Sequence, residues 1–547
     1  MRQVLTLTDQ AERLLAAGQV AEALQTVRRA QTLGLNEGRT WHVLARALAA
    51  EGDYPAALAA YNQALETGVT IVEVSAGMAR VLLRLGDHAK AEGLLTIHLQ
   101  SAPPTADAVA DLAQAQTRLG AFDRAHETLK TALETNPGEP LLWFTLAQLL
   151  SVQGRHAHAV VFFEECLRLD PGAALAQAGL AQAMLVGAGD VDRALALSAD
   201  ALAAATPAIL PAMTDAHARR LLAAGKLQVG WETFARGIEP GPAALLQVKV
   251  AAPLWTDGAP PDGQLLLIGE DSVADELLLA HVVPSLVAGG PPLVLAVHES
   301  WATLARRSFP RVAVVPLLSR DQAGRRLQAA GLDSPGVHGG QPVAAWTPLR
   351  STLATHRGTP ADFGSGGPYL KTDLGRVRYW RERVDLLGPG PKVGVLWRGR
   401  NDPRAWETPP LEALAEPLCV VGVHFISLQH EEVEGELDWI EETFGPRIYP
   451  PPTDLSHENL DDLAAFARAL DVVIGPPDTA TYLAAACGAE TWFLSTPNHW
   501  AKLGAEVYPW FPQARVISAA APDDWTDAMA ELGEALSGLA EPAHASP

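Results

Sequence analysis

Three arginines lie close together in a strongly acidic chain. Arg398, Arg400 and Arg404 fall within WRGRNDPR (397–404), whereas the 547 residues carry 41 basic and 63 acidic side chains and a formal net charge of −22. Guanidinium groups match phosphate oxygens with paired hydrogen bonds, so this segment predicts a site for a nucleotide mono- or diphosphate. The alternative is a solvated loop whose arginines pair with nearby acids.

A second candidate phosphate site lies in GPPDTATYLAAACG (475–488). Pro477 stands near a predicted helix start, and Asp478, Thr479 and Thr481 fall in its first turn. The N–H groups of that turn and the helix dipole attract anions. Because the carboxylate of Asp478 would repel a phosphate, we expect this residue either to cap the helix or to face a sugar.

An acidic turn, EDSVADE (270–276), follows an apolar run that reads as a strand. A carboxylate at a strand end that faces a cleft is placed to accept a proton, and Asp275 is the candidate. Aspartate is also common as a helix N-cap, so Asp275 is interpreted either as a base or as a cap. Glu276 is the second candidate for the same role.

For other polar residues the sequence gives weaker predictions of a binding or structural role. Gln429 follows the strand-like run 424–428 and is interpreted either as a ligand contact or as a loop hydrogen bond. His298, His424 and His499 are expected to be structural. The GxxxxGK[ST] loop is absent from the sequence, which argues against kinase or ATPase chemistry, and we predict no metal and no cofactor.

Strand-like and helical segments alternate in the second half of the chain, which predicts parallel, doubly wound sheets. A break near residues 357–390 separates two such sets and predicts two Rossmann-like lobes across a cleft. Ligands of these sheets bind at the carboxyl ends of the strands. The expected strands are 264–269, 293–297 and 312–316 in the first set, and 392–397, 424–428, 472–475 and 491–494 in the second.

The first half of the chain has a period of 34 residues. Glycine allows a tight turn between two helices, and an alanine five residues later lets the second helix approach the first. This period resembles the tetratricopeptide repeat, a helix–turn–helix unit. The recurring pairs are Gly18/Ala23, Gly52/Ala57, Gly86/Ala91, Gly120/Ala125, Gly154/Ala159 and, one residue later than the period, Gly189/Ala194.

Stacked repeats form a solenoid with a concave groove, which we expect to bind a segment of a partner protein. The alternative is a dimerisation element or a rigid spacer. A weaker seventh unit is expected from Gly225 to Phe234. Only two of the 14 tryptophans precede residue 230. This uneven distribution also indicates that the two halves of the chain are built differently. The expected domains are the array (1–240), a linker (241–262), a first lobe (263–360), a connection (361–390) and a second lobe (391–540).

The charge and the apolar pattern exclude some functions. A net charge of −22 argues against binding nucleic acid or an anionic membrane by charge alone. The first residues have no apolar signal-peptide core. The stretch Leu277–Val297 carries no charge apart from a possible one on His281. Prolines and glycines interrupt it, which suits a helix, a turn and a strand better than a membrane span. Three widely spaced cysteines predict no disulfide framework. We expect a soluble, cytoplasmic protein.

Taken together, the motifs resemble those of bacterial tetratricopeptide-linked glycosyltransferases of the GT-B fold, related to heptosyltransferases and more distantly to O-GlcNAc transferases. The resemblance covers about residues 8–535 and is greatest to enzymes thought to glycosylate flagellins. Its motifs are PLWTDG (253–258), GEDSVADELLLAHVVPSL (269–286), VGVLWRGRNDPR (393–404), ISLQ (426–429), DDLAAFARALDVVIGPPDTATYLAAACGAETWFLSTP (461–497) and YPWFPQARV (508–516).

The resemblance implies an inverting protein O-glycosyltransferase that needs no metal. Asp275 falls at the place of the proposed base of heptosyltransferases, although residues 272–274 replace the usual glycines. The arginine segment would face the nucleotide-sugar donor, the turn 477–481 would meet its phosphate, and Gln429 would lie beside the base of the nucleotide. Flagellin is the implied acceptor, and a nonulosonic acid such as pseudaminic acid from a CMP donor is the implied sugar. The residues themselves do not distinguish CMP from UDP.

Two other functions remain open at the level of the sequence. The lobes could be a transferase domain that has lost its activity and now belongs to a scaffold or secretion chaperone. The altered EDSVAD turn and Asp478 motivate this hypothesis. A transferase acting on lipopolysaccharide is less favoured, because a protein-binding array would then have no task.

Overall fold

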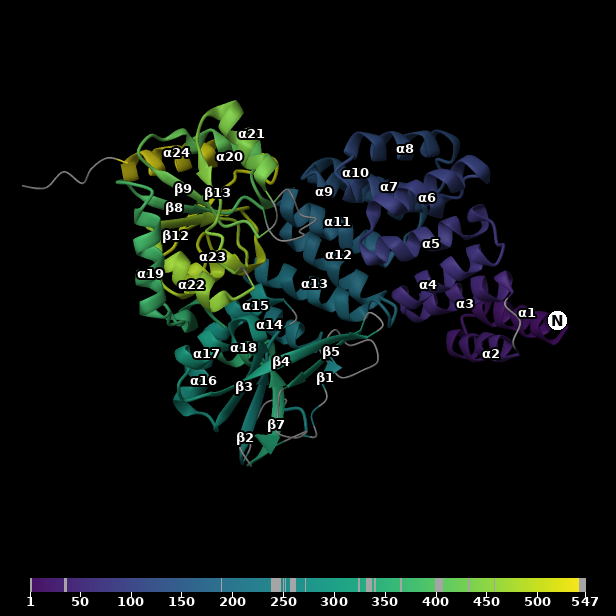
Figure 1. The fold of residues 1–547 in the computed structure, drawn as a ribbon, viewed down its shortest axis with the longest axis horizontal. Coiled ribbons are helices and arrows are strands. Elements are labelled where there is room, and N and C mark those ends of the chain that lie inside the picture. Colours follow the sequence, from purple (N-terminus) through teal and green to yellow (C-terminus); the bar gives the residue numbers. More distant parts are fainter. Residues whose placement is uncertain are drawn as a thin grey trace, which may run out of the picture. The chain divides into compact units, whose positions relative to one another are not determined.

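The structure is a computed structural model, and it divides into two compact units (Figure 1). The first comprises Met1–Ser151, His158–Gly179 and Arg320–Arg326, and the second comprises Val152–Ala157, Leu180–Ser319 and Leu327–Pro547. The described residues are 2–33, 37–187, 189–237, 247–248, 250, 252–255, 262–270, 272–322, 325–330, 337–338, 341–364, 366–398, 407–430, 433–456 and 458–540.

The predicted repeats are confirmed as antiparallel helix pairs. Gly52 and Gly86 end their helices in the left-handed conformation, with φ of 93° and 84°, which glycine adopts without strain. All six recurring alanines are fully buried, as close packing of the paired helices requires. The helices are α1 (Arg2–Ala16), α2 (Val20–Thr32), α3 (Gly38–Glu51), α4 (Tyr54–Glu66), α5 (Ile71–Leu85), α6 (His88–Ser101), α7 (Ala106–Arg118), α8 (Phe122–Thr135), α9 (Pro140–Val152), α10 (His156–Leu169), α11 (Ala174–Gly187), α12 (Val191–Ala203), α13 (Leu210–Ala223) and α14 (Leu227–Arg236).

The first sheet has the order β1-β5-β4-β3-β2-β7-β6. Its centre is parallel, because β2 pairs in parallel with β3 and β7, and β3 with β4. The three expected strands of this set are confirmed, whereas β7 was missing from the sequence prediction. The strands are β1 (Gln247–Val248), β2 (Gln264–Ile268), β3 (Leu293–His298), β4 (Ala313–Gln322), β5 (Arg325–Ala330), β6 (Val337–His338) and β7 (Gln341–Pro348).

The second sheet has the order β10-β9-β8-β11-β12-β13, and every neighbouring pair is parallel. In chain order this is 3-2-1-4-5-6, the order of a Rossmann sheet, and it reverses between β8 and β11. All four expected strands are present. The strands are β8 (Lys392–Val395), β9 (His424–Ser427), β10 (Ile448–Tyr449), β11 (Val472–Gly475), β12 (Thr491–Ser495) and β13 (Arg515–Ser518).

Helices accompany both sheets. The helical segment that follows β2 is divided into α15, a 3-10 turn at Ala280–Val282 and α16. Pro284 explains the break, because it lacks the N–H that a continuous helix requires. The α-helices are α15 (Val273–Leu279), α16 (Val283–Gly289), α17 (Ala302–Ser308), α18 (Leu353–His356), α19 (Leu374–Asp385), α20 (Leu411–Ala415), α21 (Glu434–Phe444), α22 (Leu460–Ala469), α23 (Thr479–Ala486) and α24 (Thr526–Ala540). Within the described part of the chain, no helix is long and apolar enough to cross a bilayer.

The last two helices of the array belong to the core of the second unit. Trp231 and Phe234 of α14 are fully buried in the cluster that also contains residues of both lobes. The indole Nε1 of Trp231 donates to the carbonyl of Arg357 at 2.9 Å, and its ring packs edge-on against Trp510 at 6.0 Å. The seventh repeat, which the sequence assigns to the array, therefore shares its core with the α/β lobes.

Candidate functional site

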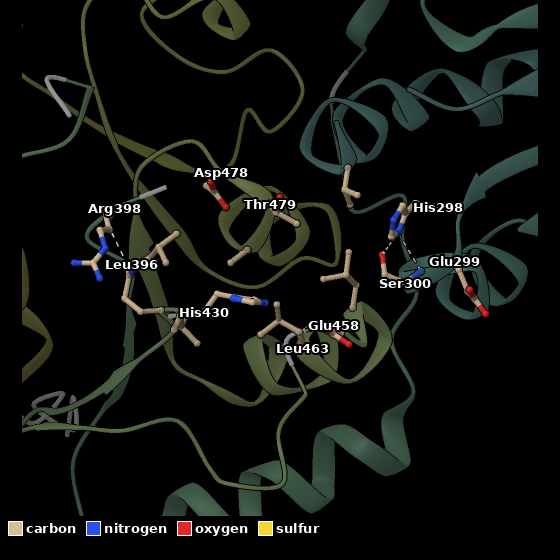
Figure 2. Close-up of a pocket in the computed structure, with 15 residues that line it drawn as sticks. His298, Glu299, Ser300, Leu396, Arg398, His430, Glu458, Leu463, Asp478 and Thr479 are labelled. Atoms are coloured by element: carbon tan, nitrogen blue, oxygen red, sulfur yellow. Dashed lines mark hydrogen bonds between the residues drawn. The ribbon is translucent and has the colours of Figure 1, made fainter. Parts of the chain in front are cut away.

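A cavity of about 470 Å³ opens in the second unit at the carboxyl ends of β8, β9 and β11 (Figure 2). This is the place where the strand order of the second sheet reverses, and such sheets bind their ligands there. Gly475 permits the close approach of the two strand ends, because a Cβ on it would lie 2.8 Å from Leu396 Cβ. The described lining residues are Val273, His298, Glu299, Ser300, Leu396, Arg398, Leu428, Gln429, His430, Glu458, Leu460, Leu463, Asp478, Thr479 and Ala480.

The turn after β8 is held from within by Gln429. Its side-chain Oε1 accepts from the backbone N–H groups of Trp397 at 2.9 Å and of Arg398 at 3.1 Å. Gln429 is buried and also lines the pocket. It thus makes the loop hydrogen bond that the sequence left as the alternative to ligand binding, and it is still placed to touch a ligand.

Arg398 lines the pocket, but its guanidinium group forms an ion pair with Glu436 of α21. Figure 2 shows that group directed away from His430. The pairing with an acid matches the solvated-loop interpretation for this arginine. Arg400 and Arg404 lie outside the described residues, so their predicted role in donor binding stays a prediction.

The N-terminus of α23 forms another wall of the pocket, through Asp478, Thr479 and Ala480. Asp478 is the N-cap of α23 and shares a capping box with Thr481, which is one of the two roles that the sequence left open. Thr481 is fully buried, donates to the carbonyl of Pro476 at 2.6 Å and accepts from Asp478 N–H at 3.0 Å. Thr481 therefore shapes the turn, and neither Thr481 nor Pro477 is among the described lining residues.

Asp275 is the third residue of α15, and the N-cap is Ser272, whose Oγ accepts from Asp275 N–H at 3.4 Å. The N-cap interpretation of Asp275 is therefore wrong. Its carboxylate pairs with Arg219 of α13, with 2.6 Å between Oδ2 and Nη2. Asp275 is not among the described residues that line the pocket. Its role as a base stays a prediction.

The Asp275–Arg219 pair belongs to a larger ion-pair network. Arg219 also pairs with Asp215 at 2.8 Å, and Arg350 pairs with Asp215 at 2.9 Å and with Glu270 at 2.6 Å. The Arg350 and Glu270 side chains are only 7% and 2% exposed. Burial raises the pKa of Glu270, and the charge of Arg350 opposes that shift.

This network occupies the reversal point of the first sheet. Glu270 follows β2 and Arg350 follows β7, the two strands between which the order of the sheet reverses. Phe234 of α14 stacks under the Arg350 guanidinium, 3.9 Å from the ring centroid. Side chains of α13 and α14 thus fill the reversal point of the first sheet with paired charges and an aromatic ring. The reversal point of the second sheet instead opens on the pocket.

Glu276 is a fully buried carboxyl group beneath the turn that follows β3. It accepts from the indole Nε1 of Trp301 at 2.6 Å and from the backbone N–H of His298 at 3.0 Å. Burial raises its pKa to about 8. Gly269 leaves the space for it, since a Cβ there would overlap the carboxylate.

The three histidines have different roles. His499 caps a short 3-10 turn by accepting from Ala501 N–H at 3.3 Å, and His424 bonds to the Pro389 carbonyl at 2.9 Å, so both are structural as predicted. His298 is exposed and lines the pocket. The structural role predicted for His298 is therefore incomplete, although its place at the end of a predicted strand is a signal for a site residue.

Comparisons with known proteins agree with the repeat half of the chain. Tetratricopeptide repeat family models match residues 8–68, 42–106, 82–150 and 141–172. Protein FlbA of Caulobacter vibrioides is 31% identical over 354 residues, which are 64% of this chain and 59% of that protein. The chain therefore spans less than two thirds of that relative's length.

Three similar solved structures cover between 31% and 44% of the chain. A tetratricopeptide repeat protein of Parabacteroides merdae is 17% identical, with 44% of this chain and 91% of that chain covered and a TM-score of 0.36. A tetratricopeptide protein of Thermus thermophilus is 24% identical, with 34% and 99% covered and a TM-score of 0.31. MamA of Desulfovibrio magneticus is 21% identical, with 31% and 97% covered and a TM-score of 0.29.

Proposed function

We propose that this protein is a glycosyltransferase that moves a sugar from a nucleotide-sugar donor to a Ser or Thr hydroxyl of a protein acceptor. The observation that carries the proposal is the pocket at the reversal point of a sheet with Rossmann strand order. The turn after β3, a central strand of the other sheet, closes the pocket on its other side. Nucleotides bind at such reversal points. The sequence motifs indicate the same class of enzyme.

The donor lies, in this proposal, along the ends of β8, β9 and β11. Backbone N–H groups in the first turn of α23 and the positive end of its dipole stabilise the phosphate. Apolar side chains of Leu396, Leu428 and Leu463 line the same cavity and suit the face of a nucleobase. Arg400 and Arg404, which lie outside the described residues, enter the proposal only as the phosphate ligands that the sequence predicts.

The repeat array binds the protein acceptor, and flagellin is the acceptor that the sequence resemblance indicates. The acceptor hydroxyl oxygen attacks the anomeric carbon, its proton passes to Asp275, and the bond to the nucleotide phosphate breaks with inversion. Arg219 is bound to the Asp275 carboxylate, so the last repeat directly contacts the proposed base.

Two measurements test the proposal. Thermal-shift titration of the full chain with CMP-, UDP-, GDP- and ADP-sugars should show stabilisation by one of them, since a ligand that binds only the folded state raises its stability. The intact mass of the flagellin, with and without this protein, should then differ by the mass of one or more sugars. An unchanged mass contradicts flagellin as acceptor.

A non-catalytic scaffold is the second candidate, and a specific observation favours it. Both Asp275 and Arg398, which the sequence assigns to chemistry and donor binding, are engaged in ion pairs with Arg219 and Glu436. Stabilisation by none of the four nucleotide-sugars, together with retained binding of a protein partner, would support the scaffold.

A further inference from the structure

The turn after β3 provides most of what the first lobe contributes to the pocket. Of the described lining residues, His298, Glu299 and Ser300 come from this turn and Val273 comes from α15. Figure 2 shows His298 and Ser300 on the wall across the cavity from Asp478 and Thr479. A ligand seated on the first turn of α23 therefore lies between these two walls.

The His298 ring is held in one orientation by its own turn. Its Nδ1 lies 2.8 Å from Ser300 Oγ and accepts from the Ser300 backbone N–H at 3.3 Å. A backbone N–H only donates, so Nδ1 is the acceptor and the neutral ring carries its proton on Nε2. The remaining nitrogen of His298 is thus a hydrogen-bond donor.

The turn is also fixed from beneath by Glu276. One carboxylate oxygen binds both the His298 backbone N–H at 3.0 Å and the Trp301 indole at 2.6 Å, so the two ends of the turn share one anchor. Glu276 is fully buried and outside the described lining of the pocket, and it holds the turn by these hydrogen bonds.

We infer that His298 binds the phosphate of the donor through its Nε2–H, opposite the first turn of α23, and that Glu276 is a positioning residue for it. The inference rests on the proposed function, because the phosphate belongs to the proposed donor. It adds a ligand contact from the first lobe to the phosphate contacts of the second.

The test measures binding to the full chain by calorimetry, with CMP, UMP, UDP, GDP and ADP as probes. For the nucleotide that binds, His298→Ala should weaken binding about tenfold or more, while the matching nucleoside, which lacks the phosphate, should lose less than about twofold. His424→Gln is the matched control, because His424 lies at the opposite end of β9 from the pocket and should leave both affinities unchanged.

The role of Glu276 is tested with Glu276→Met, which keeps the length of the side chain but has no oxygen to accept from the His298 and Trp301 N–H groups. Glu276→Met should weaken nucleotide binding several-fold in the wild-type background and not at all in the His298→Ala background. Additive losses would overturn the positioning role, because they would mean that Glu276 acts independently of His298.

The possible failures are distinguishable. Equal nucleotide affinities of wild type and His298→Ala, or equal losses for nucleotide and nucleoside, overturn the inference and leave the proposed function standing. Binding of no nucleotide to the wild type overturns the proposed function and the inference with it.

Discussion

The two sheets of the second unit are both parallel at their centres, and the points where their central strand order reverses differ. In the second sheet the ends of β8, β9 and β11 open on a pocket of about 470 Å³. In the first sheet the ends of β2 and β7 meet at Glu270 and Arg350, and Arg350 pairs with both Glu270 and Asp215 of α13. The comparison teaches that strand order marks where a ligand can bind, whereas the packing of neighbouring helices decides whether it does.

The largest expected effect is on catalysis. Asp275→Asn removes the proposed proton acceptor and should lower transfer by about 10²–10⁴-fold, the usual contribution of a general base. Stability should change little by comparison, since Arg219 keeps its pair with Asp215 at 2.8 Å. A transfer assay with thermal melting of the same samples measures both. Undiminished activity would remove Asp275 from the base role and make it a member of the structural network alone.

The next largest effect concerns the filled reversal point. Arg350→Met leaves Glu270 and Asp215 without their shared partner, and removing one member of a buried ion pair costs about 3–5 kcal/mol in the free energy of unfolding. Urea denaturation checks this value. Arg515→Met is the matched control. The side chains of Arg515 and Glu531 are 39% and 45% exposed, so loss of this ion pair should lower the free energy of unfolding by less than about 1 kcal/mol. Similar losses in the free energy of unfolding for both variants would show that the buried network stabilises the fold no more than a surface ion pair does.

A smaller effect depends on pH and concerns Glu276. Its pKa is about 8 in the folded protein against 4.5 for the ordinary group, so the folded state holds a proton that the unfolded state has released. Stability from this group is complete below pH 4.5 and is lost as the pH rises through about 8.

Glu276→Gln removes that dependence. The variant should therefore gain stability relative to wild type between pH 5 and pH 9, on the order of 1–3 kcal/mol. Denaturant titrations of both proteins across this range measure the difference. A constant difference would mean that the carboxyl group does not change its ionisation there.

The smallest expected effect is that of metal removal. Because the proposed leaving phosphate is stabilised by a helix N-terminus and guanidinium groups, EDTA should leave the transfer rate within about twofold of its untreated value. A transfer assay before and after dialysis against the chelator checks this. Loss of activity with EDTA and recovery with a divalent cation would contradict the metal-free account.

Much of the fold could be read from the sequence because it depends on local patterns. The 34-residue period fixes where glycine turns and buried alanines fall, and apolar runs such as 264–269 and 472–475 mark central strands buried on both faces. Strand β7 was missed because QPVAAWTP mixes prolines with apolar residues. The break between α15 and α16 follows from a single proline that was read only as evidence against a membrane span.

The site was predictable only in part. The turns after β8 and at the start of α23 carry local signals, and Arg398, Gln429, Asp478 and Thr479 line one pocket. The partner of Asp275 was not predictable, because Arg219 lies 56 residues earlier in a repeat with no motif for this contact. The place of His298 in the pocket was not predicted, because a single histidine forms no motif with its neighbours in the sequence. Only its position at the end of a predicted strand indicated a site residue.

The most direct test of the central claim is hydrogen–deuterium exchange of the full chain with and without the stabilising nucleotide-sugar. We predict slower exchange in the turns after β8 and β9 and in the first turn of α23, with no change in the turn after β7. Protection confined to the turn after β7, or protection in none of these segments, would contradict the proposed donor site.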